Sequence, residues 1–472
     1  MKLNELTITQ AKEGLQKKEF SAVDLTKACL DQIKTFNPHL NTFLTVTEDS
    51  TIEEAKKADE KLKNGDDAPL LGIPIALKDI YSTKNIKTTA GSKVLEDYIP
   101  SFNATVVQKY IDAGAVILGK TNLDAWAHGG SGENSDFGPT KNPWNPEYVP
   151  GGSSSGSAAA LSSHMCLAVT STDTGGSTRQ PASFCNIVGL KPTYGRVSRY
   201  GIIAMASSLD SIGLMTKTVE DSALMLSVTA GHDPMDATTP KKEVPNYVQN
   251  LKKDTKGLKI GIPREYLEEG LDKEMRKIFE ETHKPLESLG IELVEISLPH
   301  TEYALACYYI IQPAEVSSNL ARYDGIRYGF DRSKFSAEAK RRIMLGTYTL
   351  SSGYYDEYYN KAMQVRTLIK QDFDEAFKTV DTIITPVSPT PPWKLGEKVD
   401  DPLKMYLSDV YSVTANLAGI PGLAVPIGFT KDKLPVGMQI LGPQFSEELL
   451  FQIGHAYEQA TVWHTKKINL TL

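Results

Sequence analysis

The sequence lacks several features that would assign it to other classes of protein. No apolar run in its 472 residues approaches the roughly 18 residues that a membrane helix requires. Residues 1–7 turn polar at once and contain no signal-peptide core. Basic residues are outnumbered, since 51 Lys and Arg stand against 58 Asp and Glu and give a formal net charge of -7. This balance argues against direct wrapping around a nucleic acid, so another chain would have to hold any RNA partner.

Motifs of metal sites and disulfides are also absent from the sequence. The 4 cysteines lie far apart without a Cys-x-x-Cys pair, and no two of the 8 histidines have the spacing of metal ligands. The cysteines are Cys29, Cys166, Cys185 and Cys307. We therefore expect no metal in this chain, and a soluble protein of the reducing cytoplasm.

The sequence does have an ordinary globular composition, with 40% hydrophobic and 23% charged residues. Short apolar runs alternate with Gly- and Ser-rich loops and amphipathic helices, which predicts an α/β architecture. We expect one large domain over residues 1–472, with a helical part at 1–65 and a core at 66–230. Residues 231–256 would form a surface connection, and residues 257–472 would complete the sheet and carry a helical insert.

The spacing of apolar residues predicts the individual elements. Ser21 is a candidate N-cap in the helical start, and Pro285 predicts a kink or break in segment 275–289. Predicted helices cover residues 5–35, 51–64, 105–113, 275–289, 301–323, 353–378 and 447–460. Predicted strands cover residues 73–77, 115–118, 167–172, 258–262, 292–296, 382–385, 422–427 and 436–441.

Two Gly- and Ser-rich clusters, residues 151–157 and 173–179, are the most unusual stretches of the chain. Small-residue and apolar segments adjoin them, which favours a place in the packed body over the alternative of two flexible loops. Glycines in the second cluster would let backbone N–H groups converge on a developing negative charge. Ser177, at the end of that turn, would then be placed to act as a nucleophile.

A serine nucleophile needs a base, and the sequence offers a lysine more readily than a histidine. Lys78 closes the apolar run 71–77. If Lys78 is buried, its charged form is disfavoured and it would accept a proton near neutral pH. The alternative is an exposed lysine at a strand end. Ser154 sits in a Gly-x-Ser-x-Gly match, but we do not expect a nucleophile there because a loop precedes it instead of a strand.

Residues 114–121 match the phosphate-loop pattern Gly-x-x-x-x-Gly-Lys-Thr letter for letter. A phosphate-binding loop must follow a strand and wrap the phosphates with its own backbone. Here a predicted helix precedes Gly114, and the four intervening residues are themselves a predicted strand. The sequence therefore predicts no nucleotide site at this match.

Taken together and in order, these residues resemble the amidase signature family. The matches are Lys78 and the segments 152–154 and 173–181. The resemblance implies that Ser177 is the acyl-forming nucleophile and that Lys78 is the terminal base. It implies further that Ser153, preceded by a cis peptide bond, relays protons between them.

The same resemblance implies the surroundings of the nucleophile and the fold. The backbone N–H groups of Thr174, Gly175, Gly176 and Ser177 would hold the oxyanion, while Asp173 and Arg179 would support the loop. The family fold is a single large α/β unit whose central mixed sheet is flanked by helices on both faces.

Within this family, the chain resembles the glutamine-hydrolysing subunits of tRNA-dependent amidotransferases over nearly its whole length. The similar stretches are residues 191–201, 207–210, 322–329, 351–355 and 416–422. The resemblance implies that Tyr308, Arg342 and Asp409 bind glutamine. An arginine for the α-carboxylate and an aspartate for the α-ammonium match the charges of an amino acid. The alternative is that Arg342 belongs to a plain basic surface at 340–342.

Such subunits work with a B-like subunit, which binds ATP, magnesium and the tRNA, and with a small C-like subunit. The resemblance implies that this chain supplies ammonia for converting Glu-tRNA(Gln), and in some organisms Asp-tRNA(Asn), while holding no cofactor itself. A free-standing amidase of small aliphatic or aryl amides is the alternative within enzymes. A non-catalytic scaffold subunit is the alternative from another class.

The chain departs from the family pattern at three places. Ser155 stands where glycine is common, and Thr178 where Ile or Leu usually follows the nucleophile. The stretch between Tyr328 and Arg341 is shorter than in most such subunits. We expect the first two changes to tune the site and the third to alter the fold beside the glutamine site.

Overall fold

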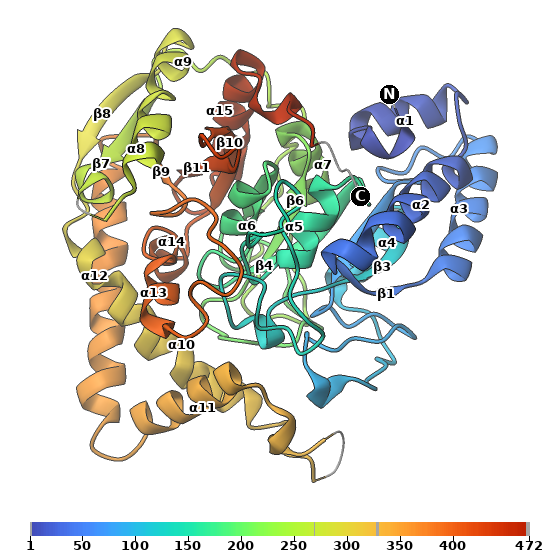
Figure 1. Cartoon of the computed structure of the whole chain (residues 1–472). Coiled ribbons are helices and arrows are strands. Elements are labelled where there is room, and N and C mark those ends of the chain that lie inside the picture. Colours follow the sequence, from blue (N-terminus) through green and yellow to red (C-terminus); the bar gives the residue numbers. More distant parts are fainter. Residues whose placement is uncertain (1, 269, 327–329, 469–472) are drawn as a thin grey trace.

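A mixed β-sheet of 11 strands forms the centre of the computed structural model, which describes residues 2–268, 270–326 and 330–468 (Figure 1). The strand order is β1-β3-β2-β4-β6-β5-β10-β11-β9-β7-β8. The strands are β1 Phe43–Val46, β2 Pro74–Lys78, β3 Val116–Thr121, β4 Ala168–Asp173, β5 Val188–Lys191, β6 Ser211–Thr216, β7 Lys259–Pro263, β8 Glu292–Ile296, β9 Thr382–Pro386, β10 Gly422–Phe429 and β11 Pro435–Leu441. Strand β2 is parallel to β3 and β4, and β7 is parallel to β8 and β9; the other pairs are antiparallel.

Every strand predicted from the sequence is present, with ends shifted by at most three residues. The sequence does not predict β1, β5 or β6. Strands β1 and β5 have only 4 residues each, and β5 and β6 are interrupted by glycine, which weakens the periodic signal.

The helices surround this sheet (Figure 1). They are α1 Ile8–Gln16, α2 Ala22–Leu40, α3 Glu48–Lys63, α4 Thr105–Asp112, α5 Ser155–Ser162, α6 Arg179–Phe184, α7 Val219–Thr229, α8 Lys273–Glu280, α9 His283–Ser288, α10 Ala304–Leu320, α11 Ala337–Thr349, α12 Lys361–Ala376, α13 Pro402–Leu407, α14 Val413–Ala418 and α15 Glu447–Ala460. Ser21 caps α2 as predicted, because its hydroxyl accepts from the backbone N–H of Asp24 and the Asp24 carboxylate accepts in return.

One helical prediction and one loop interpretation need correction in detail. The predicted helix 275–289 is broken between α8 and α9, but Pro285 lies inside the first turn of α9, where its missing N–H leaves no bond unmade. The cluster 151–157 is not wholly a loop, because α5 begins at Ser155.

Helices cover both faces of the sheet. Two consecutive residues of β10, whose positions face opposite sides of the sheet, contact different helices. A Cβ placed on Gly422 would lie 3.1 Å from Arg179 Cδ in α6. A Cβ placed on Gly454 in α15 would lie 2.7 Å from Leu423 Cδ2. Residues 422 and 423 are consecutive in a strand and point to opposite faces. Helices α6 and α15 therefore pack on opposite sides of the sheet.

One hydrophobic cluster runs through the described residues from Ile8 in α1 to Tyr457 in α15. No helix among the described residues is long and apolar enough to cross a membrane. Between α7 and β7 the chain forms neither helix nor strand, in keeping with a connection at 231–256. Residues 327–329 lie outside the described part of the chain, so the resemblance over 322–329 and the short stretch after Tyr328 are only partly visible.

Candidate active site

The predicted catalytic residues meet at one edge of the sheet. Strands β2 and β4 are parallel neighbours, so their carboxyl ends lie at the same edge. Lys78 is the last residue of β2, and Ser177 follows β4 in the loop that leads into α6. Ser153 lies in the loop before α5 and completes the group. A sheet edge at the carboxyl ends of parallel strands is a common place for an α/β ligand site.

Lys78 is fully buried, so the alternative of an exposed strand end is excluded. Its Nζ lies 2.9 Å from Ser153 Oγ, 2.9 Å from Ser154 Oγ and 2.8 Å from Thr172 Oγ1. Burial lowers the pKa of Lys78 to about 7, although the carboxylates of Asp124, Asp173 and Asp210 act at longer range to raise it.

Three hydroxyls surround an amine that, when neutral, has two N–H donors and one lone pair. The Ser154 hydroxyl donates to the carbonyl of Thr172, at 3.3 Å, and so accepts from Lys78. The Ser153 hydroxyl has no acceptor among the described residues other than Lys78 Nζ. In the neutral state it is therefore free to donate to Lys78.

The peptide bond between Gly152 and Ser153 is cis, as the resemblance implied. Ser153 is fully buried, and its carbonyl accepts from the backbone N–H of Asp124 at 3.2 Å. The backbone N–H of Gly152 donates to Gln180 Oε1 at 3.1 Å. The bridging serine is thus held from both sides by neighbouring segments.

The backbone donors around Ser177 differ in part from those predicted. The N–H of Gly176 donates to Asp173 Oδ1 at 2.9 Å and is therefore not free to bind an oxyanion, which corrects the expectation for Gly176. Among the described residues, the N–H groups of Thr174, Gly175 and Ser177 have no acceptor. A developing negative charge near Ser177 can use these three donors.

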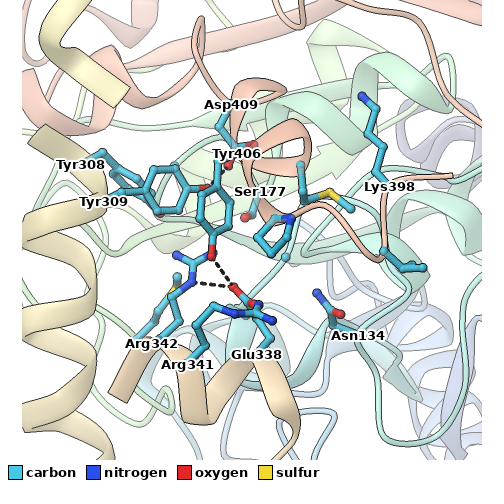
Figure 2. Close-up of a pocket in the computed structure, with 18 of the residues that line it drawn as sticks. Asn134, Ser177, Tyr308, Tyr309, Glu338, Arg341, Arg342, Lys398, Tyr406 and Asp409 are labelled. Atoms are coloured by element: carbon cyan, nitrogen blue, oxygen red, sulfur yellow. Dashed lines mark hydrogen bonds and ion pairs between the residues drawn. The ribbon is translucent and has the colours of Figure 1, made fainter. Parts of the chain in front are cut away.

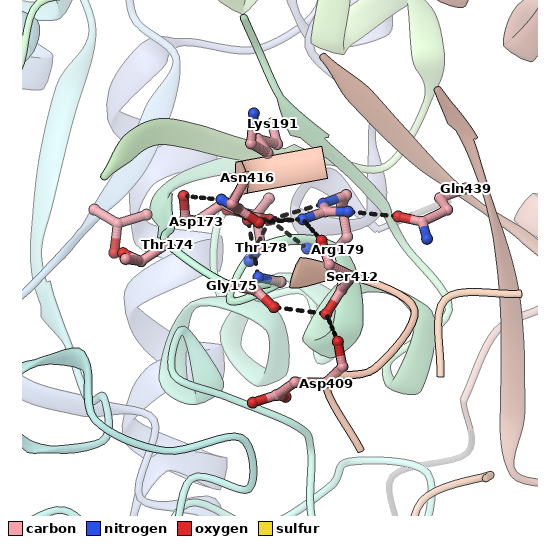
Figure 3. Close-up of polar contacts among 12 residues, drawn as sticks. Asp173, Thr174, Gly175, Thr178, Arg179, Lys191, Asp409, Ser412, Asn416 and Gln439 are labelled. Atoms are coloured by element: carbon pink, nitrogen blue, oxygen red, sulfur yellow. Dashed lines mark hydrogen bonds and ion pairs between the residues drawn. The ribbon is translucent and has the colours of Figure 1, made fainter. Parts of the chain in front are cut away.

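Asp173 and Arg179 support this loop, as predicted (Figure 3). Asp173 accepts from the backbone N–H groups of Gly176 and Thr178 and from Arg179 Nε, at 2.9, 3.2 and 3.0 Å. Burial raises the pKa of Asp173, but the charge and hydrogen bonds of Arg179, the charge of Lys191 and the amide of Asn416 together outweigh it and bring the pKa to about 2. The buried ion pair fixes the shape of the turn that carries Ser177.

A cavity of about 120 Å³ lies over Ser177 (Figure 2). Its walls come from loop 127–134, from α10 and α11, and from the segment 398–409 around α13. Tyr308, Arg342 and Asp409 all line it together with Ser177. The structure therefore brings together the three residues predicted to bind substrate and the predicted nucleophile.

Of the two predicted charges of opposite sign, Arg342 is buried and Asp409 is half-buried. Arg342 is 3% exposed, and its guanidinium lies 4.7 Å from the ring centroids of Tyr309 and Tyr406. This excludes the alternative of a plain basic surface for Arg342. Asp409 accepts from the Tyr309 hydroxyl at 2.8 Å, and burial raises its pKa to about 6.

Sequence reasoning missed the partners of Arg342. Its Nε donates to Glu338 Oε1 at 2.7 Å, and its Nη1 donates to Gln312 Oε1 at 2.6 Å. Tyr406 also donates to Glu338, at 3.1 Å (Figure 2). The signal that would have found Glu338 is its i,i+4 spacing from Arg342 on a helix. Gln312 and Tyr406 gave no local signal, because they are distant in sequence.

Lys120, in the phosphate-loop match, has a structural role instead. A helix precedes Gly114 and strand β3 occupies residues 116–121, as predicted. Lys120 is fully buried and pairs with Asp79 at 3.2 Å. Its Nζ also donates to the carbonyl of Tyr81 at 2.7 Å, so it faces the protein interior.

Comparison with known proteins extends this picture. The sequence model of the family described as Amidase matches residues 24–451. The chain is 53% identical to the glutamyl-tRNA(Gln) amidotransferase A-subunit of Geobacter metallireducens, with 100% of both chains covered. It is 52% identical to the corresponding A-subunit of Thermoanaerobacter pseudethanolicus, covering 99% of this chain and 98% of the other.

Solved structures of the same family resemble this chain in fold. The crystal structure of the glutamyl-tRNA(Gln) amidotransferase A-subunit from Thermotoga maritima matches with a TM-score of 0.83 and 42% identity, covering 97% of this chain and 95% of the other. The peptide amidase of Stenotrophomonas maltophilia matches with a TM-score of 0.82 and 29% identity, covering 96% of each chain. On the family match and these full-length relatives, this chain belongs to the amidase family.

Proposed function

We propose that this chain is the glutamine-hydrolysing subunit of a Glu-tRNA(Gln) amidotransferase. The observation that carries the proposal is a cavity that has Ser177 beside it and the opposite charges of Arg342 and Asp409 in its walls. A free-standing hydrolase of small uncharged amides has no use for such a pair. Two relatives, 53% and 52% identical to this chain, are named as the A-subunit of such an amidotransferase, which supports the same function.

In this proposal, glutamine binds with its α-carboxylate toward Arg342 and its α-ammonium toward Asp409. Tyr308 packs against the substrate side chain; its hydroxyl lies close to Gly175, where an added Cβ would be only 2.6 Å from it. These contacts direct the side-chain amide of glutamine toward Ser177. Charge-assisted hydrogen bonds of this kind are the strong ones in a binding site.

Acylation then begins with Ser177 Oγ attacking the amide carbon. Its proton passes to Ser153 Oγ, which passes its own proton to neutral Lys78 Nζ. The carbonyl oxygen becomes an oxyanion held by backbone N–H groups of the loop at 174–177. When the tetrahedral intermediate collapses, Lys78 returns the proton through Ser153 to the nitrogen, which leaves as ammonia.

Water completes the reaction by the same route. Lys78, again neutral, accepts a proton through Ser153 as a water attacks the acyl carbon on Ser177. Collapse of the second intermediate releases glutamate and restores the Ser177 hydroxyl. The low pKa of Lys78 suits a base that must gain and lose a proton near neutral pH.

We propose further that ammonia passes to a B-like subunit, which binds ATP, magnesium and Glu-tRNA(Gln), within a heterotrimer completed by a C-like subunit. The acidic net charge of -7 agrees with leaving the tRNA to that partner. The 4 cysteines are buried and unpaired, which agrees with the cytoplasm as the site of action.

The test is ammonia release by the chain co-purified with its host partners, from glutamine and from a panel of aliphatic and aryl amides. We expect glutamine to be preferred, and Ser177→Ala to lower the rate on the order of 10⁴-fold. Preference for simple amides with glutamine ignored would establish the free-standing amidase instead. Unchanged ammonia release in Ser177→Ala would mean that this chain is a scaffold for another glutaminase.

A further inference from the structure

Gln180 has a buried side-chain donor that the reaction above leaves unused. It lies in the first turn of α6, three residues after Ser177, and is 2% exposed. Its Nε2 is buried and has no hydrogen-bond partner among the described residues. An unpaired buried amide costs free energy, so an amide held in this state is suited to a ligand that would pair it.

The orientation of the Gln180 amide is fixed by its other end. Oε1 accepts from the backbone N–H of Gly152 at 3.1 Å. Gly152 offers only a donor there, so a flipped amide would set N–H against N–H. The Nε2 group must therefore point away from Gly152.

Gly130 shows where the Nε2 group of Gln180 lies. A Cβ placed on Gly130 would be 3.6 Å from Gln180 Nε2, 3.3 Å from Asp409 Oδ1 and 3.6 Å from Ser408 Oγ. Gly130 and Asp409 both line the cavity over Ser177. Gly130 has no side chain, and we call the position that its Cβ would occupy, between this amide donor and this carboxylate acceptor, the notch.

A donor beside an acceptor complements the head of an α-amino acid, in which an ammonium and a carboxylate are attached to the same carbon. Asp409 Oδ1 can accept from the ammonium, and Gln180 Nε2 can donate to a carboxylate oxygen. Arg342 already uses its Nε–H on Glu338 and one Nη1–H on Gln312, so that Gln180 Nε2 adds a donor to the three that the guanidinium still offers that carboxylate. The carboxylate has two oxygens that need donors.

We propose that Gln180 is a specificity-determining residue, whose amide donates to the substrate α-carboxylate in the notch at Gly130. This inference rests on the proposed function and deepens it. It divides recognition of the amino-acid head between Arg342, Asp409 and the helix that begins just after the nucleophile.

The test compares glutamine with 4-aminobutanamide, which is glutamine without its α-carboxylate. Gln180→Glu keeps an acceptor for Gly152 and replaces the donor by a negative charge. We expect the ratio of kcat/KM for glutamine to kcat/KM for 4-aminobutanamide to fall at least about tenfold, which corresponds to about 1.4 kcal/mol, through a higher KM for glutamine. An unchanged ratio would overturn the proposal.

A second readout does not require turnover of the short amide. The inhibition constant of 4-aminobutanamide against glutamine hydrolysis should stay within about threefold in Gln180→Glu, while KM for glutamine rises about tenfold. An equal rise in both constants would overturn the proposal, because it would mean that Gln180 acts only by holding Gly152.

Gly130→Ala provides an independent variant. Its φ angle is not in the left-handed region, and the added Cβ would be only 3.3 Å from its nearest neighbour, so the loop can accept alanine with a small shift. Filling the notch should raise KM for glutamine more than the inhibition constant of 4-aminobutanamide. An equal rise in KM for glutamine and in the inhibition constant of 4-aminobutanamide would contradict binding of the α-carboxylate in the notch.

Measurements on the wild-type complex distinguish a failure of the proposed function from a failure of the role of Gln180. If it releases ammonia from glutamine and the ratio is insensitive to Gln180→Glu, only the role of Gln180 fails. If it ignores glutamine and hydrolyses uncharged amides, the proposed function itself fails.

Discussion

At the scale of single residues, two buried lysines on neighbouring strands have opposite surroundings. Lys120 pairs with the carboxylate of Asp79 at 3.2 Å, and its pattern in the sequence mimics a nucleotide site. Lys78 is surrounded by hydroxyls and has no carboxylate in contact among the described residues. Burial therefore lowers the pKa of Lys78 to about 7, near the pH at which a general base works.

The pH dependence of the reaction should report this pKa. Because Lys78 must be neutral to accept a proton, kcat/KM for glutamine should rise about tenfold per pH unit below pH 7 and level off above it. The profile is measured with the intact complex between pH 5 and 9. A rate that is flat across pH 6 to 8 would contradict the role of Lys78 as the base.

Substituting the two lysines should separate catalysis from stability. Lys78→Met should abolish ammonia release and change the free energy of unfolding by about 1 kcal/mol or less, because it removes a buried amine without an ionic partner. Lys120→Met should lower that free energy by about 3–5 kcal/mol, since it leaves Asp79 buried and unpaired, with kcat per folded molecule within about threefold.

Both variants are measured by urea unfolding and by active-site-normalised turnover. Loss of activity in a fully folded Lys120→Met protein would mean that Lys120 contributes to the reaction. Full activity in Lys78→Met would require another base.

At the scale of elements, the turn between β4 and α6 is fixed by one carboxylate. Asp173 accepts hydrogen bonds from that turn and is paired with Arg179, and both side chains are fully buried. Ser412 adds a link to the substrate wall, because its hydroxyl donates to the carbonyl of Gly175 at 2.6 Å (Figure 3). The nucleophile loop and the segment that carries Asp409 are thus joined directly.

Asp173→Asn should lower the free energy of unfolding by about 3–5 kcal/mol at pH 7, because Arg179 loses its buried partner. Since the pKa of Asp173 is lowered to about 2, the stability from this pair is present above its unfolded pKa and is lost as the pH falls through about 2. Acid unfolding of Asp173→Asn should accordingly depend less on pH in that range.

Glu375→Gln is the matched control, because Glu375, near the end of α12, and Lys378, in the turn after it, form an exposed pair. Its removal should cost less than about 1 kcal/mol. If urea unfolding gave the same loss in free energy of unfolding for both substitutions, the buried pair would stabilise the protein no more than the exposed one.

At the scale of the whole molecule, the sheet continues across the connection at 231–256. Strands β7 and β8 come after that connection, yet they extend the same sheet through β9 and β11. Strand β10 pairs with β5, so the two halves of the chain share hydrogen bonds and one hydrophobic cluster.

This continuity predicts a single cooperative unfolding unit. Far-UV circular dichroism and tryptophan fluorescence of the isolated chain should give coincident transitions in urea, because Trp126 and Trp393 lie on opposite sides of the connection. Cleavage within 231–256 should leave the two fragments associated. Two separated transitions, or fragments that part on gel filtration, would divide the chain into two domains.

The sequence by itself determined most of the elements and indicated the candidate reacting residues. Short apolar runs such as the one in β2 and helical spacing such as that of α15 can be recognised in the sequence directly. Lys78, Ser153 and Ser177 were found because their order and their flanking glycines form a pattern. The same local view missed β5 and β6, which pair with each other, while β6 also pairs with β4.

Only the tertiary structure decided what those residues face. Whether Lys78 was buried, and whether Arg342 was a surface charge or a binding group, depended on contacts between segments far apart in the chain. The use of the Gly176 N–H by Asp173 and the unpaired amide of Gln180 were equally hidden. Burial and hydrogen-bond partners are properties of the packed chain, because they arise from side chains that no local pattern brings together.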